Sequence, residues 1–360
     1  MYSDRLNRQY VGFHVGAAQR VAFAPACTLH ARDPRTEMRR LFPALLACAA
    51  AAISTPLAAQ MPAYPAKPIR IVVPYAVGGY ADTFARLVAA DLAKAMGQPV
   101  IVVSKPGANG NIACEYVAKA ASDGYTLLLG GVNTHAINTS LYSDLPFDPV
   151  RDFTPVSFVV APNTLIVVNP ALDVSTVGEL VALARSKPGL LNYGSGGTGT
   201  FTHLAVESLK SSANLDLIHV PYKGEGESLL ALLRGDVALA ALSVPTALQH
   251  VRSGKLRPIA ATGTSRSSAF PDLPTVAQTL PGDSAISWIG LFGPAMLAPE
   301  IALRLNQEVG NLMASPELRE RLAASDSTFV AMTPAEFGAF QKSEIARWAA
   351  VIRKNRIRVE

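Results

Sequence analysis

The sequence predicts an α/β protein with two lobes and a ligand cleft between them. From Tyr64 onward, strand-like and helix-like segments alternate, a pattern typical of sheets that are largely parallel. The chain has 360 residues, which is long for a single hydrophobic core and favours two domains. In addition, a strand-to-helix turn that contains glycines occurs in each half of the chain, and ligands bind at the carboxyl ends of strands in such folds.

The alternation can be followed in order along the chain. The expected strands are Ile69–Val73, Val100–Ser104, Thr126–Gly130, Val156–Val160, Leu165–Val168, Asn192–Tyr193, Leu217–Val220, Val237–Leu242, Pro258–Ala261 and Ile286–Phe292. The expected helices are Ala81–Met96, Ile112–Ala120, Val177–Ser186, Phe201–Ser211, Glu227–Arg234, Pro245–Arg252, Pro299–Ala314, Pro316–Ala323 and Pro334–Arg353.

The division into lobes follows from two interruptions. Ala161-Pro162-Asn163 separates two apolar strands, and the segment 284–292 is expected to cross back to the first block. We therefore expect residues 60–162 and 285–360 to form lobe 1 and residues 163–284 to form lobe 2.

The two glycine turns are the candidate binding loops. The first, at residues 74–83, contains Gly78 and Gly79, and the second runs from Gly194 to Thr200. Glycine lets the backbone approach a ligand closely, and the helix start after each turn adds unpaired N–H groups and a positive dipole end. Each turn is therefore a candidate anion site. The alternative for either turn alone is an ordinary connection between a strand and a helix.

The first 59 residues resemble targeting sequence. Met38-Arg39-Arg40, an apolar stretch to Ile53 and the small residues before Gln60 form a secretory signal peptide, residues 38–59. We therefore expect residues 1–37 to be an upstream extension produced by a misassigned start codon. Two alternatives are an uncleaved anchor, although the apolar stretch is shorter than the roughly 20 residues of a membrane span, and a lipoprotein cut at Cys48.

The charge balance and the cysteine content argue against nucleic-acid binding and against a zinc site. Residues 1–59 hold seven arginines and three acids, which leaves 25 basic and 24 acidic residues in the exported part. No basic cluster remains there, so nucleic-acid binding is not expected. Cys114 is the remaining cysteine and is expected to be a buried structural residue in a helix, and no cysteine or histidine spacing indicates a zinc site.

Three catalytic or cofactor motifs do not fit the sequence. The segment Gly194–Gly199 matches G-x-G-x-x-G, but the acid that would hold a ribose is missing, because Asp216 lies at the wrong end of the next strand. A hydrolase elbow G-x-S-x-G fails at Tyr193, and no P-loop occurs. No cofactor is therefore expected.

Nine short motifs follow one another over some 290 residues: Tyr64–Arg70, Gly78–Asp82, Asp123–Leu128, Leu145–Pro149, Asn192–Ser195, His219–Gly224, Gly254–Arg257, Pro271–Thr275 and Trp288–Gly290. In their order and spacing they resemble the periplasmic solute receptors of tripartite tricarboxylate transporters, the Bug receptors. Two departures are Val77, where the family has proline, and the loop Ser104–Asn109, where an Asn-Arg start is more usual.

The resemblance implies a periplasmic-binding-protein (Venus-flytrap) fold without catalysis. It also implies a monomer in the periplasm that binds a small organic carboxylate between the lobes, with a tripartite membrane permease as partner. Two alternatives remain open: an exported α/β enzyme acting on a small carboxylate or ester, and an oligomeric scaffold without a small ligand.

The candidate ligand-binding residues follow from the two loops and this resemblance. Backbone amides and hydroxyls are expected to bind the carboxylate, and they come from Gly78, Gly79, Ser195, Gly197, Thr198, Gly199 and Thr200. Tyr75 and Tyr222 are expected to form the cleft walls, and His135 or Ser243 to contact the far end of the ligand.

Three further candidates each have a second interpretation. Asp82 is either a helix N-cap or a partner for an amino or hydroxyl group of the ligand. His203, in the first helical turn, either contacts the ligand or lies on the helix surface. Lys223 either reaches the anion or remains solvated.

Overall fold

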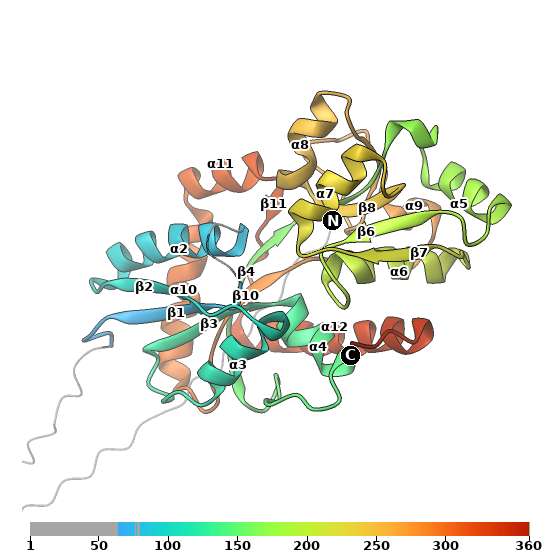
Figure 1. Ribbon diagram of the computed structural model, residues 1–360. Coiled ribbons are helices and arrows are strands. Elements are labelled where there is room, and N and C mark those ends of the chain that lie inside the picture. The colour runs from blue at the N-terminus through green and yellow to red at the C-terminus, as the bar shows by residue number, and fades with distance from the viewer. Residues whose placement is uncertain (1–63, 76, 78–79, 360) are drawn as a thin grey trace, which may run out of the picture. The chain divides into compact units, whose positions relative to one another are not determined.

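The computed structural model describes residues 64–75, 77 and 80–359, and these residues form two lobes, each built on one β-sheet (Figure 1). The expected extension 1–37, the signal peptide 38–59 and the loop residues Gly78 and Gly79 lie outside the described residues. No helix in the described part of the chain combines the length and apolarity that a membrane crossing needs.

The first sheet has six strands in the order β11-β4-β10-β3-β1-β2. β1 pairs in parallel with β2 and β3, whereas β10 pairs antiparallel with β3 and β4. The bounds are β1 Ile69–Val73, β2 Val100–Ser104, β3 Thr126–Gly131, β4 Phe153–Pro162, β10 Ile289–Pro294 and β11 Ser327–Thr328.

Helices cover both faces of this sheet, which is why β1 is apolar at almost every position. Ile69, Ile71 and Val73 pack with α2 and α10, whereas Val72 points to the opposite face and packs with α3. The helices of this part are α2 Tyr80–Met96, α3 Asn111–Ala118, α4 Asn138–Leu141, α10 Pro299–Ala314, α11 Pro316–Ala324 and α12 Pro334–Asn355, with short turns η1 Ala108–Gly110 and η2 Asn133–Ile137. Cys114 of α3 is buried and free, as expected.

The second sheet has five strands in the order β7-β6-β8-β5-β9. Its strands are β5 Thr164–Val168, β6 Asn192–Ser195, β7 Ile218–Pro221, β8 Leu239–Ser243 and β9 Arg257–Ala261. Its helices are α5 Val177–Ser186, α6 Phe201–Ala213, α7 Glu225–Arg234, α8 Val244–Arg252 and α9 Val276–Thr279, with the turn η3 Pro170–Leu172. Alternate residues of β5 again face opposite cores, since Leu165 packs with α7 and α8, and Ile166 with α6.

The expectation of largely parallel sheets is wrong, because both sheets are mixed. β5 is antiparallel to both of its neighbours, β8 and β9, and β10 is antiparallel to β3 and β4. The reason is the chain path: β4 continues into β5 with only Asn163 between them, so the chain enters the second sheet without an intervening helix. β10 brings the chain back to the first sheet in the same way, after the segment 280–288.

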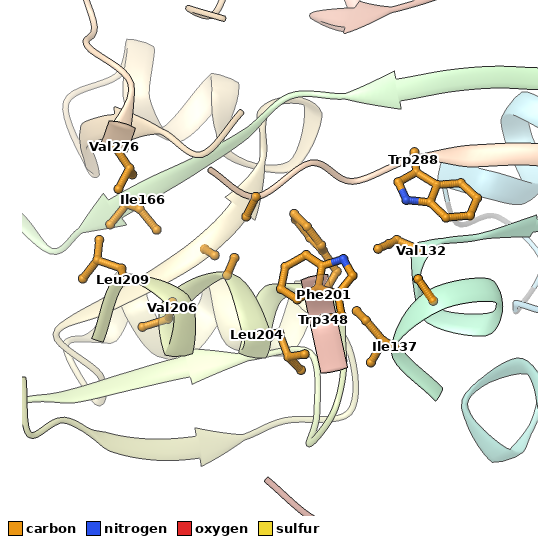
Figure 2. Close-up of a cluster of buried hydrophobic side chains, with 14 of the residues drawn as sticks. Val132, Ile137, Ile166, Phe201, Leu204, Val206, Leu209, Val276, Trp288 and Trp348 are labelled. Atoms are coloured by element: carbon orange, nitrogen blue, oxygen red, sulfur yellow. The ribbon is translucent and has the colours of Figure 1, made fainter. Parts of the chain in front are cut away.

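A continuous apolar cluster joins helices from the two lobes. Phe201, at the start of α6, packs edge to face against Trp348 of α12 with ring centroids 5.8 Å apart. Figure 2 shows Ile137 next to this pair, and Val132 and Trp288 belong to the same cluster. Asn355 at the end of α12 also donates a hydrogen bond to the carbonyl of Glu207 in α6. The last helix therefore contacts both lobes.

Candidate functional site

A cavity of about 420 Å³ lies where the two sheets meet. The first lobe contributes residues that follow β1 and β3, and the second contributes residues that follow β6, β7 and β8. The lining residues are Tyr75, Tyr80, Ala81, Val132, Asn133, Pro162, Thr164, Gly196, Thr200, Phe201, Thr202, Gly224, Glu225, Ser243, Ser287, Trp288 and Ile289.

Four helices begin at this cavity. Tyr80 is the first residue of α2, and Thr200, Gly224 and Ser243 are the N-cap residues of α6, α7 and α8. The first N–H groups of a helix have no partner within the helix, and the helix dipole places partial positive charge there. The four helix starts therefore place partial positive charge at the cavity, and none of its described lining residues is Lys, Arg or His.

Two of the helix-start amides already have protein partners. The amide of Phe201 donates to Asn133 Oδ1 at 3.1 Å, which ties the start of α6 to the first lobe. The amide of Val244 donates to the carbonyl of Asn163 at 2.9 Å. By contrast, the amides of Thr202 and Glu225 have no hydrogen-bond partner among the described residues, so both are available as donors to a ligand.

The glycine loop before α6 is used differently from what we expected. The amide of Gly197 donates to Ser195 Oγ at 3.1 Å, and that of Gly199 donates to His203 Nδ1 at 3.0 Å. The amide of Thr200 donates to the carbonyl of Gly197 at 3.2 Å. These three amides stabilise the loop itself, so the free donors identified above lie in the first turns of α6 and α7.

Glycine is required in that loop for backbone conformation. Gly197 has φ of 126° and Gly199 has φ of 78°, both in the region that other residues rarely adopt. Ser195 is not part of the lining, and its Oγ lies 2.6 Å from His219 Nε2. The loop therefore sets the position of Thr200, whose Oγ1 accepts the amide of His203 as the N-cap of α6.

The one acidic side chain in the described lining is Glu225, in the first turn of α7. Its carboxylate accepts a hydrogen bond from the amide of Ser243, at the start of α8. The hydroxyls of Ser243 and Thr246 also hydrogen-bond to it. Burial raises the pKa of the Glu225 carboxyl, and these hydrogen bonds oppose that rise.

The rest of the lining is largely aromatic and apolar. Burial raises the pKa of Tyr75 and Tyr80 above the ordinary value of 10.0, so both are neutral donors near neutral pH. Tyr80 Oη lies 2.8 Å from Ser327 Oγ, and Trp288 Nε1 donates to Glu344. These contacts fix the orientation of the rings that form the cavity walls.

Of the predicted ligand-binding residues, the structure brings Tyr75, Thr200 and Ser243 to the cavity. Asp82 is buried away from the lining, where its carboxylate pairs with Arg86 and accepts a hydrogen bond from Ser104.

His135 lies in the turn η2, and its ring is stacked on Phe292 with centroids 3.9 Å apart. Its side chain is fully buried and does not line the cavity, and burial lowers its pKa to about 3. A ring held in this way acts as a core side chain, because neighbouring aromatic rings and not solvent surround it.

The remaining predicted residues also lie outside the lining. His203 is buried and stacked on His219 with centroids 3.8 Å apart, so the interpretation as a surface residue of the helix is wrong, and the residue is not in the lining. Lys223 is exposed, and its backbone amide donates to Glu227. The others outside the lining are Ser195, Gly197, Thr198, Gly199 and Tyr222.

Eight polar or aromatic residues of the cavity were not predicted from the sequence: Tyr80, Asn133, Thr164, Phe201, Thr202, Glu225, Ser287 and Trp288. Glu225 had a usable signal. We expected α7 to begin at Glu227, but Gly224 is its N-cap and has φ of 110°, which puts Glu225 in the first turn. Asn133 and Trp288 had none, because their position depends on contacts between segments far apart in the chain.

Two lobes with a cavity between them, lined by helix starts and aromatic rings, define a solute-binding protein. The family model described as the tripartite tricarboxylate transporter family receptor matches residues 84–357. The chain therefore belongs to this receptor family, which consists of solute receptors and not enzymes.

Individual relatives cover most of the chain. BugT of Bordetella pertussis is 35% identical over 308 residues, 85% of this chain and 94% of that protein. The structure of R. palustris Rpa4515 with adipate is 33% identical, covers 82% of this chain and 100% of that one, and has a TM-score of 0.75. MatC of Rhodopseudomonas palustris with bound malate is 31% identical, covers 80% and 100%, and has a TM-score of 0.71.

These relatives agree with the two-lobed periplasmic-binding-protein fold that the sequence predicted, and they identify the class of protein as periplasmic. Within the part of the chain that the structure describes, no group of His, Cys, Asp and Glu side chains could hold a metal ion.

Proposed function

We propose that the protein captures a small organic carboxylate in the cavity between its lobes and delivers it to a tripartite membrane permease. The observation that carries the proposal is the convergence of four helix starts on one cavity whose described lining has no basic side chain. Helix starts favour anions through their free amides and dipoles, and they do so without the desolvation cost of a buried lysine or arginine.

The carboxylate is proposed to bind at the starts of α6 and α7. The free amides of Thr202 and Glu225 donate to its oxygens, and the hydroxyls of Thr200 and Thr202 lie beside them in the lining. Tyr75 and Ser243 contact the remainder of the ligand. The adipate and malate complexes of two relatives, each more than 30% identical, support a carboxylate as the ligand class.

We also propose the limits of the two lobes, their closure on the ligand, the monomeric state and the removal of the signal peptide. Residues 60–162 with 285–360 form lobe 1, residues 163–284 form lobe 2, and the lobes close on the ligand about the crossings near Asn163 and Ser287. The protein acts as a monomer, and the signal peptide is removed at or near Gln60 during export. The two-sheet arrangement supports the lobe limits, because the strand β4 ends at Pro162 and β5 begins at Thr164.

The test is native mass spectrometry of the protein purified from the periplasm, followed by calorimetry with the identified compound and a panel of carboxylates. We expect a copurified carboxylate that binds with micromolar or tighter affinity and is recovered chemically unchanged. Conversion of the compound would favour the exported enzyme instead. If no carboxylate of the panel binds or shifts the melting temperature, the result would favour an oligomeric scaffold and contradict the proposed receptor function.

A further inference from the structure

Glu225 gives the proposed carboxylate site an unexpected acidic end. It is the one carboxylate in the described lining, and the aromatic and hydroxyl side chains around it carry no charge near neutral pH. No charged side chain is among the groups that act on its carboxyl, which are the amide and hydroxyl of Ser243 and the hydroxyl of Thr246. A salt bridge within the described chain therefore does not account for its presence in the cavity.

The position of this carboxylate is fixed. The amide of Ser243 donates to one oxygen, and Ser243 Oγ in turn lies 2.9 Å from Thr246 Oγ1. The helix start of α8 thus holds the Glu225 side chain in place on the second lobe. The backbone amide of the same residue remains free at the start of α7, so Glu225 presents a donor and an acceptor to one ligand.

Such an arrangement discriminates between ligands by charge. A ligand group that donates a hydrogen bond, above all a protonated amine, would complete the coordination of the carboxylate. A second carboxylate in the same place would face a like charge in a partly desolvated cavity, and it would bind only after one of the two groups takes up a proton.

We propose that the ligand of this receptor carries one carboxylate and one hydrogen-bond-donating group, a protonated amine above all, and that the Glu225 carboxylate binds the donor and selects against dicarboxylates. This inference rests on the proposed function, because it assumes that a carboxylate occupies the helix starts of α6 and α7. It goes further because it states which chemical group lies at the opposite end of the ligand and that Glu225 binds this group.

The test compares ligands that differ in one terminal group. Calorimetry at neutral pH is carried out on the protein purified from cells that express the full 360-residue chain. The first set is butyrate, succinate, 4-hydroxybutyrate and 4-aminobutyrate, and the second is the corresponding set with six carbons, which includes adipate. The variant is Glu225→Gln, and its matched control is Glu227→Gln, an exposed position on the same helix outside the lining.

We expect the amino acid to bind more tightly than the dicarboxylate of the same length by about tenfold or more, the effect of one charge-assisted hydrogen bond. Glu225→Gln should reduce this ratio by a similar factor, mainly by improving dicarboxylate binding, and Glu227→Gln should leave it unchanged. In the unmodified protein, dicarboxylate binding should strengthen as the pH falls through the raised pKa of Glu225, with uptake of a proton.

Dicarboxylates that bind as tightly as the amino acids at neutral pH, with a ratio that Glu225→Gln does not change, would overturn the inference and leave the proposed function intact. Failure of every carboxylate to bind would overturn both. If Glu225→Gln does not fold, the order of affinities and their pH dependence in the unmodified protein decide the question.

Discussion

Replacement of Gly196 by alanine tests whether the helix-start amides bind the ligand. Gly196 lies in the lining between α6 and α7, and its φ is outside the left-handed region. A Cβ built on it would lie 3.2 Å from the amide nitrogen of Glu225 and 3.5 Å from Thr202 Oγ1. The added methyl group would therefore cover one of the two free amides that we assign to the carboxylate.

The expected magnitude follows from the bond that the methyl group blocks. A hydrogen bond to a charged group contributes about 1.5–3 kcal/mol, so its loss should weaken binding by about 10- to 150-fold. The nearest atoms belong to the backbone of Gly224 and Glu225 and would have to shift by a few tenths of an ångström, so thermal unfolding without ligand measures the effect on stability. Alanine also reduces the entropy of the unfolded chain, which offsets part of that cost.

The assay is calorimetry with the carboxylate that copurifies, together with thermal unfolding without ligand. Gly226→Ala is the matched control, because a Cβ there meets no atom within 4 Å and the residue is outside the lining. It should bind normally and be somewhat more stable, since alanine favours a helix. Normal affinity in Gly196→Ala would refute the assignment of the carboxylate to this amide.

Four further outcomes are expected. Asn133→Ala should lower the free energy of unfolding in urea by about 1–3 kcal/mol, because it leaves the buried amide of Phe201 without its acceptor. Unfolded histidine titrates near 6.5 whereas burial lowers the pKa of His203 to about 4, so acidification protonates the unfolded chain first. This difference should cost about 2 kcal/mol of stability at pH 5, and His203→Asn should remove that part of the loss. Lys223→Ala should weaken ligand binding less than about tenfold, since this exposed side chain is outside the lining; abolished binding would instead indicate an ion pair. Amino-terminal sequencing of the exported protein should begin within a few residues of Gln60, and a peptide from residues 10–20 would contradict this.

The local sequence pattern was sufficient to predict most of the helices and strands. β1 and β2 have the bounds that their apolar runs predicted, as do α5 and α10. The cap of α12 was also readable, because Thr333 and Glu336 form a capping box around a proline. Such signals are local, since propensity, caps and glycine turns depend on residues within a few positions of one another.

Local pattern failed where the chain crosses between the sheets. The direction of β5 in its sheet depends on the link through Asn163, and the short strand β11 exists only because Ser327 and Thr328 meet the end of β4. Neither the link at Asn163 nor the two residues of β11 have a sequence pattern that indicates these pairings. Strand direction and edge pairing are settled by partners that are distant along the chain.

The candidate site shows the same division between sequence and tertiary structure. The sequence by itself determined that two glycine turns precede helices. It placed Tyr75 and Ser243 shortly after strands and Thr200 directly before a helix, so these residues reach the cavity. Only the tertiary structure decided that His135 is enclosed by aromatic rings and that Asn133 and Trp288 reach the cavity.

The physical reason is that a side chain's surroundings depend on packing across long separations. The hydrogen bond from Phe201 to Asn133 joins residues 68 positions apart, and the stacking of His135 on Phe292 joins a turn to a distant strand. Sequence periodicity specifies which face of an element is buried, but the atoms that meet that face come from other elements. The tertiary structure therefore determines which polar groups form hydrogen bonds within the protein and which remain free to bind a ligand.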